Sequence, residues 1–230
     1  HYTAPARLDE SVLAALEELT SLAPLHQPHN LSPARTLMAL KPGLPQIGCF
    51  DTAFHATMTP TARRFGLPRS MEEEGVKRYG FHGLSYEYIA ASLKQVAPER
   101  ANGRIIVAHL GSGASLCALR NGQSVDTTMG LTALDGLVMG TRVGALDPGA
   151  VLYLMKQGMT TDDLERLLYL HSGLLGVSGF SGDMRALLGS DRPEAGEAMD
   201  LFVFRTVREI GAMAASLGGL DGLVFTAGIG

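Results

Sequence analysis

The most informative segment of the sequence is residues 105–128, which read IIVAHLGSGASLCALRNGQSVDTT. The two strongly apolar runs on either side of Gly111-Ser112-Gly113 each have the length of a buried strand. Asn121-Gly122 then leads into a third run, 123–128, and this dipeptide between two strand-like runs is a strong hairpin signal. The segment therefore predicts three consecutive strands separated by two glycine turns.

Around this segment, apolar residues that recur every three or four positions predict several helices. The first predicted helix is 9–22, capped by Asp9 or Ser11 and stopped by Pro24. A second starts at about Ser85 and carries Tyr88, Ile89 and Leu93, and a third begins at Asp147-Pro148. The fourth is 197–217, which ends at Gly218-Gly219. The predicted apolar face of the last helix is Met199, Val203, Val207, Ile210, Ala214 and Leu217. Short strands are expected at 47–51 and 223–226, a loop at 24–33 and an irregular connection at 60–80. The alternation of helices and strands favours an α/β or α+β fold.

Composition narrows the class of protein. Of the 230 residues, 46% are hydrophobic and 18% charged, which is enough apolar material for a core and too little charge for a disordered chain. The net charge is −4 and the basic residues are scattered, so we expect no nucleic-acid partner. No apolar run approaches the roughly 18 residues that a membrane span needs, and the first residues lack the pattern of a signal peptide.

Two further features bear on location and completeness. Cys49 and Cys117 lie in apolar stretches without metal-ligand spacing, which predicts reduced core thiols in a cytoplasmic protein. The chain starts at His1 rather than Met and stops inside a glycine turn at Gly230, so we expect a truncated or partly ordered polypeptide.

Several residues could bind or stabilise anions. Glycine turns at 111–113 and 227–230 follow apolar strands, and consecutive backbone N–H groups in such turns can form an anion nest. Arg142 lies between glycines in an uncharged surrounding, where a guanidinium can grip phosphate or carboxylate oxygens in a bidentate way. His82 could donate a hydrogen bond to developing charge, and Asp51 at a strand end could hold a metal or orient a neighbour.

Each of these features also has an ordinary structural explanation. The glycine segments match neither a Walker loop nor a dinucleotide fingerprint, and a lone arginine or histidine often serves only the fold. A further alternative, ranked last, is a zinc hydrolase built on His55, His82 and His109. No two of these histidines fall four residues apart on a helix, and no cysteine or paired carboxylate joins them at ligand spacing.

Taken together, the motifs resemble the acetate kinase family over nearly the whole chain. The resemblance rests on Phe50-Asp51-Thr52-Ala53-Phe54-His55, Arg78-Tyr79-Gly80-Phe81-His82-Gly83, His109-Leu110-Gly111-Ser112-Gly113-Ala114-Ser115, the stretch from Thr128 through Gly140-Thr141-Arg142 to Asp147-Pro148, and Phe225-Thr226-Ala227-Gly228-Ile229-Gly230. It implies an α/β fold of the ribonuclease H-like, actin-like ATPase superfamily, with two domains that close over a nucleotide. Residues 1–53 would then end an incomplete first domain, and residues 54–230 would form most of the second.

The resemblance also implies roles for individual residues. Asp51, His82 and Arg142 match the catalytic positions, and Leu25, Phe81 and Ala133 match the wall of the substrate pocket. The positions that match nucleotide contacts are His109, Leu110, Gly111, Ser112, Gly113, Asp183, Met184, Arg185, Gly228, Ile229 and Gly230. The implied activity is transfer of the γ-phosphoryl group of ATP to acetate or another short-chain carboxylate, with Mg²⁺, in a homodimer.

The sequence departs from the family pattern at several places. Ser112 stands where the family generally has Asn, and Ala133 replaces a proline of the acetate pocket, so acetate and propionate both remain possible substrates. The family's amino-terminal segment, with a metal-side Asn and a substrate-binding Arg, and its carboxy-terminal Mg²⁺-binding Glu have no counterpart here. A nucleotide-binding module without turnover is therefore the second hypothesis, ranked after the kinase and ahead of the zinc hydrolase.

Overall fold

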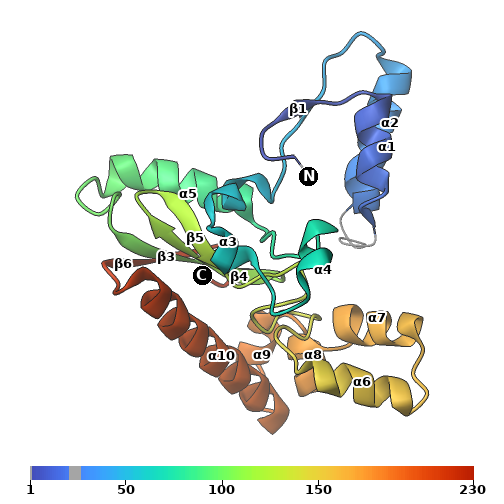
Figure 1. The fold of residues 1–230 in the computed structure, drawn as a ribbon. Helices are drawn as coiled ribbons and strands as arrows, with labels where there is room; N and C mark the ends of the chain where they lie inside the picture. Colours follow the sequence, from blue (N-terminus) through green and yellow to red (C-terminus); the bar gives the residue numbers. More distant parts are fainter. Residues whose placement is uncertain (1, 21–26) are drawn as a thin grey trace.

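A four-stranded mixed sheet forms the centre of the computed structural model, which describes residues 2–20 and 27–230 (Figure 1). Strands β3 (Arg104–Leu110), β4 (Ala114–Arg120) and β5 (Gln123–Thr127) are antiparallel neighbours, and β6 (Gly222–Thr226) pairs with β3 in parallel. The order across the sheet is β5-β4-β3-β6. The predicted strands and both of their turns are thus confirmed to within one residue at each end.

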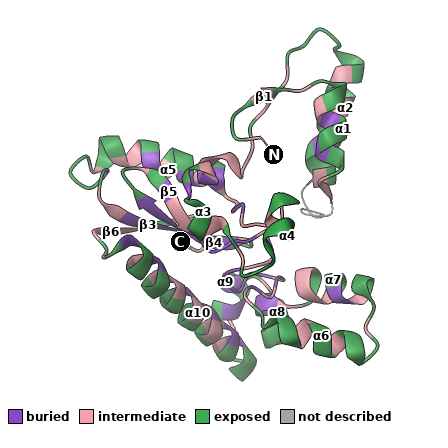
Figure 2. Cartoon of the chain, in the orientation of Figure 1, coloured by how far each residue is buried: buried purple, intermediate pink, exposed green. Residues whose placement is uncertain are grey.

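Helices cover both faces of the sheet, which explains why β3 and β4 read as continuous apolar runs. One face carries Ile106, Ala108 and Leu116 and packs against α10 (Pro193–Leu217). Side chains of the opposite face, including Ile105 and Val107, pack against α5 (Gly83–Val96). Figure 2 shows these strands as the most deeply buried part of the molecule. Because side chains alternate along a strand, every second residue serves the other layer.

Helix α10 is longer than predicted, and its predicted apolar face is confirmed in part: Leu217 is buried in the main core, and Met199, Ile210 and Ala214 pack against that core. It starts at Pro193, and its left-handed Gly218, at φ 72°, caps it as expected. Val203 and Val207 are exposed, whereas the buried residues are Ala195, Ala198, Phe202, Thr206, Met213 and Leu217. The helix carries apolar residues on more than one face, so their spacing alone could not identify the packed one. Thr206 can be buried because its hydroxyl donates to the carbonyl of Phe202 at 2.8 Å.

Helix α5 confirms the predicted element but corrects its core. It runs from Gly83 rather than Ser85, and Tyr86 and Ala90 are its buried side chains after the first turn. Tyr88, predicted on the apolar face, is 71% exposed. Ile89 and Leu93 pack partly against the sheet as expected. The tyrosine that enters the core is therefore the one two positions earlier.

The amino-terminal residues form a unit with its own small core. Strand β1 (Ala6–Arg7) pairs antiparallel with β2 (Ile47–Gly48), and α1 (Glu10–Glu17) packs against α2 (Gln27–Leu40) through Leu13, Leu16, Leu31 and Ala34. Asp9 caps α1 by accepting from the backbone N–H of Val12 at 2.9 Å. This helix ends at Glu17 rather than Leu22, and the predicted strand 47–51 spans two residues only.

The loop predicted for residues 24–33 is wrong from Gln27 onward, because α2 occupies this stretch. Pro28 lies in the first turn of the helix, where a missing N–H is harmless, and Pro33 is tolerated inside it. Leu31 and Ala34 pack against α1, and these contacts favour the helix although its prolines disfavour it. Packing here outweighs local propensity.

Short helices fill the rest of the chain. They are η2 (Ala53–Thr57), α3 (Pro60–Arg63), α4 (Arg69–Glu73), α6 (Pro148–Lys156), α7 (Thr161–Leu170), α8 (Gly173–Ser178) and α9 (Met184–Leu188). Asp147 caps α6 as predicted, whereas the irregular connection at 60–80 contains α3 and α4. Among the residues described, no helix has the length and apolar character of a membrane span. Cys117 is buried as predicted, but Cys49, predicted as a core thiol, is exposed.

The orientation of α10 leads to a stability prediction. Phe202 is 5% exposed and belongs to the main core, whereas Phe204, two positions later, is 65% exposed. We expect Phe202→Ala to lower the free energy of unfolding by about 3 kcal/mol, since it leaves a cavity beneath the sheet. Phe204→Ala is the matched control and should change it by less than about 0.5 kcal/mol. Urea denaturation of both variants measures this, and equal losses would contradict the observed packing.

Candidate active site

A cavity of about 480 Å³ lies between the amino-terminal unit and the central sheet. Asp51, His82 and Arg142, predicted from separate parts of the sequence, all line it. Phe81 and Ala133, predicted as substrate-pocket residues, line it as well, and Leu25 lies outside the described residues. Its other walls come from both sides and include Leu16, Leu31, Cys49, Phe50, Tyr79 and Leu131. The structure therefore joins a polar group of three side chains to an apolar hollow.

The carboxylate of Asp51 connects the amino-terminal unit to the start of α5. One oxygen accepts from the backbone N–H of His82 at 2.6 Å and the other from that of Leu84 at 3.3 Å. Its backbone carbonyl accepts from the N–H of Gly83 at 2.9 Å. A carboxylate at a helix N-terminus satisfies unpaired donors and interacts favourably with the helix dipole. In this arrangement Asp51 orients its neighbour, one of the two roles expected for it.

His82 occupies the left-handed backbone region, at φ 57° and ψ 21°, just before α5. This turn directs its imidazole towards β4, where Nδ1 is 2.8 Å from the hydroxyl oxygen of Ser115. The ring stacks on that of His109, with centroids 4.1 Å apart and planes 21° apart. Burial lowers the pKa of His109 from its usual value. His109, predicted as a nucleotide contact, thus lies directly against the predicted catalytic histidine.

Arg142 is 7% exposed and belongs to the loop between β5 and α6. Its Nη1 donates to the carbonyl of Ala133 at 2.7 Å, and burial lowers the pKa of its guanidinium. A methyl group added at Gly113 would clash with Nη2 of Arg142 and lie 3.4 Å from Nε2 of His82. The arginine and the histidine therefore converge on the first glycine turn, and a side chain at Gly113 would displace the guanidinium of Arg142.

The predicted nucleotide segments meet around this turn. The backbone N–H of Gly140 donates to the carbonyl of Ser112 at 2.9 Å, and that of Ile229 donates to the carbonyl of Leu110 at 2.8 Å. A methyl group at Gly140 would lie 3.1 Å from the carbonyl oxygen of Gly182, the residue before Asp183. Segments 110–113, 182–183 and 228–230 are thus linked through short backbone contacts.

The individual residues of these segments differ in exposure. Asp183 caps α9 by accepting from the N–H of Arg185 at 2.9 Å, and both side chains are exposed. Met184, between them, is buried in the main core. Gly228 has open space where a side chain would be, whereas a side chain at Gly230 would clash with the backbone of Thr226.

The zinc alternative is wrong for His55. This residue is 1% exposed, and its Nδ1 and Nε2 lie 2.8 Å from the hydroxyl of Ser124 and 2.9 Å from the carbonyl of Phe81. Both ring nitrogens therefore have hydrogen-bond partners and neither is available to a metal. Within the described residues, no three His, Cys, Asp or Glu side chains gather as a metal site.

Two hydroxyl groups at the site were not predicted. Ser115 and Tyr86 are fully buried, and the Tyr86 hydroxyl makes a short hydrogen bond to the Ser115 hydroxyl, which in turn contacts Nδ1 of His82. Ser85 contacts Nδ1 of His109 at 2.9 Å. A serine inside an apolar strand is a weak sequence signal for such a contact, because its partner comes from a helix far along the chain.

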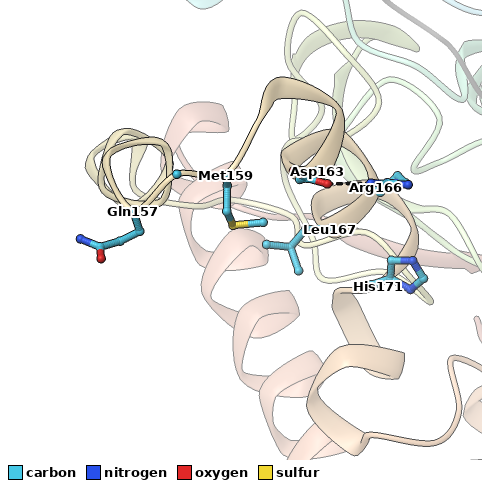
Figure 3. A pocket seen from close by; sticks show the side chains of 7 residues that line it. Gln157, Met159, Asp163, Arg166, Leu167 and His171 are labelled. Atoms are coloured by element: carbon cyan, nitrogen blue, oxygen red, sulfur yellow. Dashed lines mark hydrogen bonds and ion pairs between the residues drawn. The ribbon is translucent and has the colours of Figure 1, made fainter.

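A second hollow of about 520 Å³ lies at the junction of α6 and α7 (Figure 3). Figure 3 shows Met159 and Leu167 directed towards one another and Asp163 paired with Arg166, whose closest atoms are 2.6 Å apart. None of its lining residues belongs to the cavity at Asp51. None of the residues that line this hollow was predicted as a site residue.

The profile of the Acetokinase family matches residues 1–230. The chain belongs to the acetokinase family. It is 58% identical to an acetate kinase of Rhodopseudomonas palustris, and the alignment covers all of this chain but 58% of that relative. The chain thus spans little more than half the length of the curated relatives it matches.

Solved structures of acetokinase-family members confirm the fold prediction. The acetate kinase of Porphyromonas gingivalis superimposes with a TM-score of 0.88 and 40% identity, covering 99% of this chain and 59% of that one. A propionate kinase of Francisella tularensis gives a TM-score of 0.93 and 35% identity, covering 100% and 60%. The chain therefore has the α/β fold of the ribonuclease H-like, actin-like ATPase superfamily and represents part of it.

The buried histidines make stability depend on pH. Burial lowers the pKa of His55 and of His109 in the folded chain. Below about pH 6.5 the unfolded chain then binds more protons than the folded one, so the free energy of unfolding falls as the pH falls. We expect lower stability in urea at about pH 5.5 than at about pH 7.5.

A His55→Gln variant is the control for this pH dependence. It should show a smaller decrease, because one of the two titrating groups is gone, while His109 still contributes in the same direction. Equal stability of the unmodified chain at both pH values would contradict the assignment.

Proposed function

We propose that the complete protein containing this chain is an acetate kinase, which transfers the γ-phosphoryl group of ATP to acetate and forms acetyl phosphate and ADP. The observation that carries the proposal is the shared cavity of Asp51, His82 and Arg142 beside the Gly111–Gly113 turn. Similarity to relatives that are acetate kinases supports it.

The chemistry suits these residues. A carboxylic acid is ionised at neutral pH, since its pKa is about 4, so the nucleophile needs no general base. The obstacle is repulsion between the carboxylate and the negatively charged phosphate. Catalysis of phosphoryl transfer therefore depends on alignment and on positive or hydrogen-bonding groups around a loose transition state. The buried Arg142 acts in a site of low dielectric, where its charge is screened less than in water.

The site also suits a nucleotide that carries Mg²⁺. Mg²⁺ commonly binds through one or two carboxylates together with substrate phosphates and water. Asp51 is the one carboxylate among the described residues that line the cavity, so it is the residue of this chain that would bind the ion. The ion would neutralise phosphate charge. The glycine turns at 111–113 and 228–230 would hold the phosphates through backbone N–H groups, and Asp183, Met184 and Arg185 would border the nucleotide.

The proposed domain boundary lies after residue 53. The separate core of α1 and α2, and the location of the cavity between this unit and the sheet, support assigning residues 1–53 to the first domain and 54–230 to the second. A homodimer is proposed on the resemblance to the family alone. The two free cysteines, Cys49 and Cys117, favour a cytoplasmic location.

Two specific observations favour alternatives. Ala133 gives the pocket a small wall residue, which favours propionate as a substrate. The chain covers 58% of its relative from Rhodopseudomonas palustris, which favours a module that binds nucleotide without turnover when these residues stand alone. The ratio of kcat/KM for acetate to that for propionate separates the two substrates.

Trapping of acyl phosphate with hydroxylamine tests the proposed function. We expect the complete polypeptide, incubated with ATP, Mg²⁺ and acetate, to form acetohydroxamate in proportion to enzyme. The 230-residue chain alone is the second sample, and nucleotide binding by this chain without product would identify it as the binding module. Absence of product from the complete polypeptide with every short-chain acid would contradict the proposal.

Replacement of Arg142 tests the charge argument. We expect Arg142→Ala to lower kcat by about 100-fold or more, because a preorganised group facing the transferring phosphoryl group is lost, with a smaller effect on the KM for ATP. Arg166→Ala, at the separate α6–α7 hollow, is the matched control and should leave kcat unchanged. An unchanged kcat for the Arg142 variant would remove this residue from the mechanism.

A further inference from the structure

We propose that Tyr86 and Ser115 are positioning residues that hold the imidazole of His82 in the tautomer with its proton on Nε2. The inference rests on the proposed function, in which His82 donates a hydrogen bond to the transferring phosphoryl group. It gives a functional role to two buried hydroxyl groups that do not line the cavity.

The three groups form a continuous chain. The Tyr86 hydroxyl and the Ser115 hydroxyl make a short hydrogen bond, and the Ser115 hydroxyl lies 2.8 Å from Nδ1 of His82. Tyr86 and Ser115 are each 0% exposed, so bulk water does not reach them. Each hydroxyl proton should therefore be donated to another of these three groups, because a buried donor without an acceptor costs about 1–3 kcal/mol.

Counting protons favours one direction of donation. If Tyr86 donates to Ser115, then Ser115 can donate to Nδ1 of His82, and both hydroxyl protons are used. In the opposite direction, Nδ1–H of His82 donates to Ser115 and Ser115 donates to Tyr86. The phenol proton would then need another acceptor, and Ser115 is the one hydrogen-bond partner recorded for this hydroxyl within the described chain. The first direction makes Nδ1 an acceptor and places the proton on Nε2.

The phenol is a dependable donor at neutral pH. Burial raises the pKa of Tyr86 well above its usual value, so the group keeps its proton.

The consequence concerns the side of the ring that faces the glycine turn. Nε2 is the nitrogen of His82 that lies near Gly113. With the proton fixed there, the imidazole presents a donor to a phosphoryl oxygen and needs no proton from solvent. An acceptor at the same place would repel the phosphate oxygens instead. The hydroxyl chain thus decides whether His82 helps or opposes the reaction.

Two measurements on the same variants test this inference. The first is ¹⁵N NMR of the histidine rings, which distinguishes the protonated from the unprotonated ring nitrogen of His82. The second is the kinetics of acetyl phosphate formation by the complete polypeptide. In the unmodified protein we expect His82 to carry its proton on Nε2.

Tyr86→Phe removes only the phenolic donor. We expect a mixture of His82 tautomers, a fall in kcat of about 10-fold and a KM for ATP within about twofold, since a fall of this size corresponds to one hydrogen bond. Should this variant fail to fold, Ser115→Ala replaces it and should also lose the single tautomer of His82 and reduce kcat.

The matched control is Ser124→Ala. Ser124 is equally buried and contacts Nδ1 of His55 at 2.8 Å, but it lies outside the cavity. It should lose comparable stability and leave kcat and the His82 tautomer unchanged. A His82 proton on Nδ1 in the unmodified protein, or an unchanged kcat and tautomer in the folded Tyr86→Phe or Ser115→Ala variant, would overturn the inference. Absence of product from the unmodified protein would overturn the proposed function instead, while the NMR result would still decide the tautomer.

Discussion

The hydrogen bonds from the start of α5 to Asp51 are the interaction on which the site depends. They bring together a short strand of the amino-terminal unit, a left-handed turn and a helix that covers the central sheet. One carboxylate thereby fixes the direction in which the imidazole of His82 leaves the backbone. A charge-assisted bond of 2.6 Å is short and directional, which suits this task.

Much of the fold could be predicted from local patterns. The strands between Arg104 and Thr127 have clear ends because glycine turns and the Asn121-Gly122 hairpin punctuate them. The packed face of α10 could be predicted only in part, since Met199, Ile210, Ala214 and Leu217 pack as their spacing indicates, whereas Val203 and Val207 are exposed. Helix α2 was missed for a similar reason. Its two prolines argue against a helix, and the contacts with α1 that favour one join residues far apart in the sequence.

The site was predictable in part, and for a different reason. The glycines and Arg142 follow from the need for backbone to approach an anion, and the resemblance to a family supplied their grouping. No local pattern indicated that Tyr86 reaches Ser115, because 29 positions separate them in the chain. The exposure of Cys49 was also missed, because this short segment, predicted as a strand over 47–51, lies at the surface: β2 ends at Gly48 and its own Ile47 is exposed.

The left-handed backbone of His82 has a practical consequence for mutagenesis. At φ 57° most residues with a side chain are strained, whereas glycine and asparagine adopt this region readily. Replacement by alanine would therefore remove the imidazole and disturb the first turn of α5 together. His82→Asn removes the imidazole while retaining a residue that adopts this backbone conformation readily. The effect of losing the ring can then be measured apart from any change in the backbone.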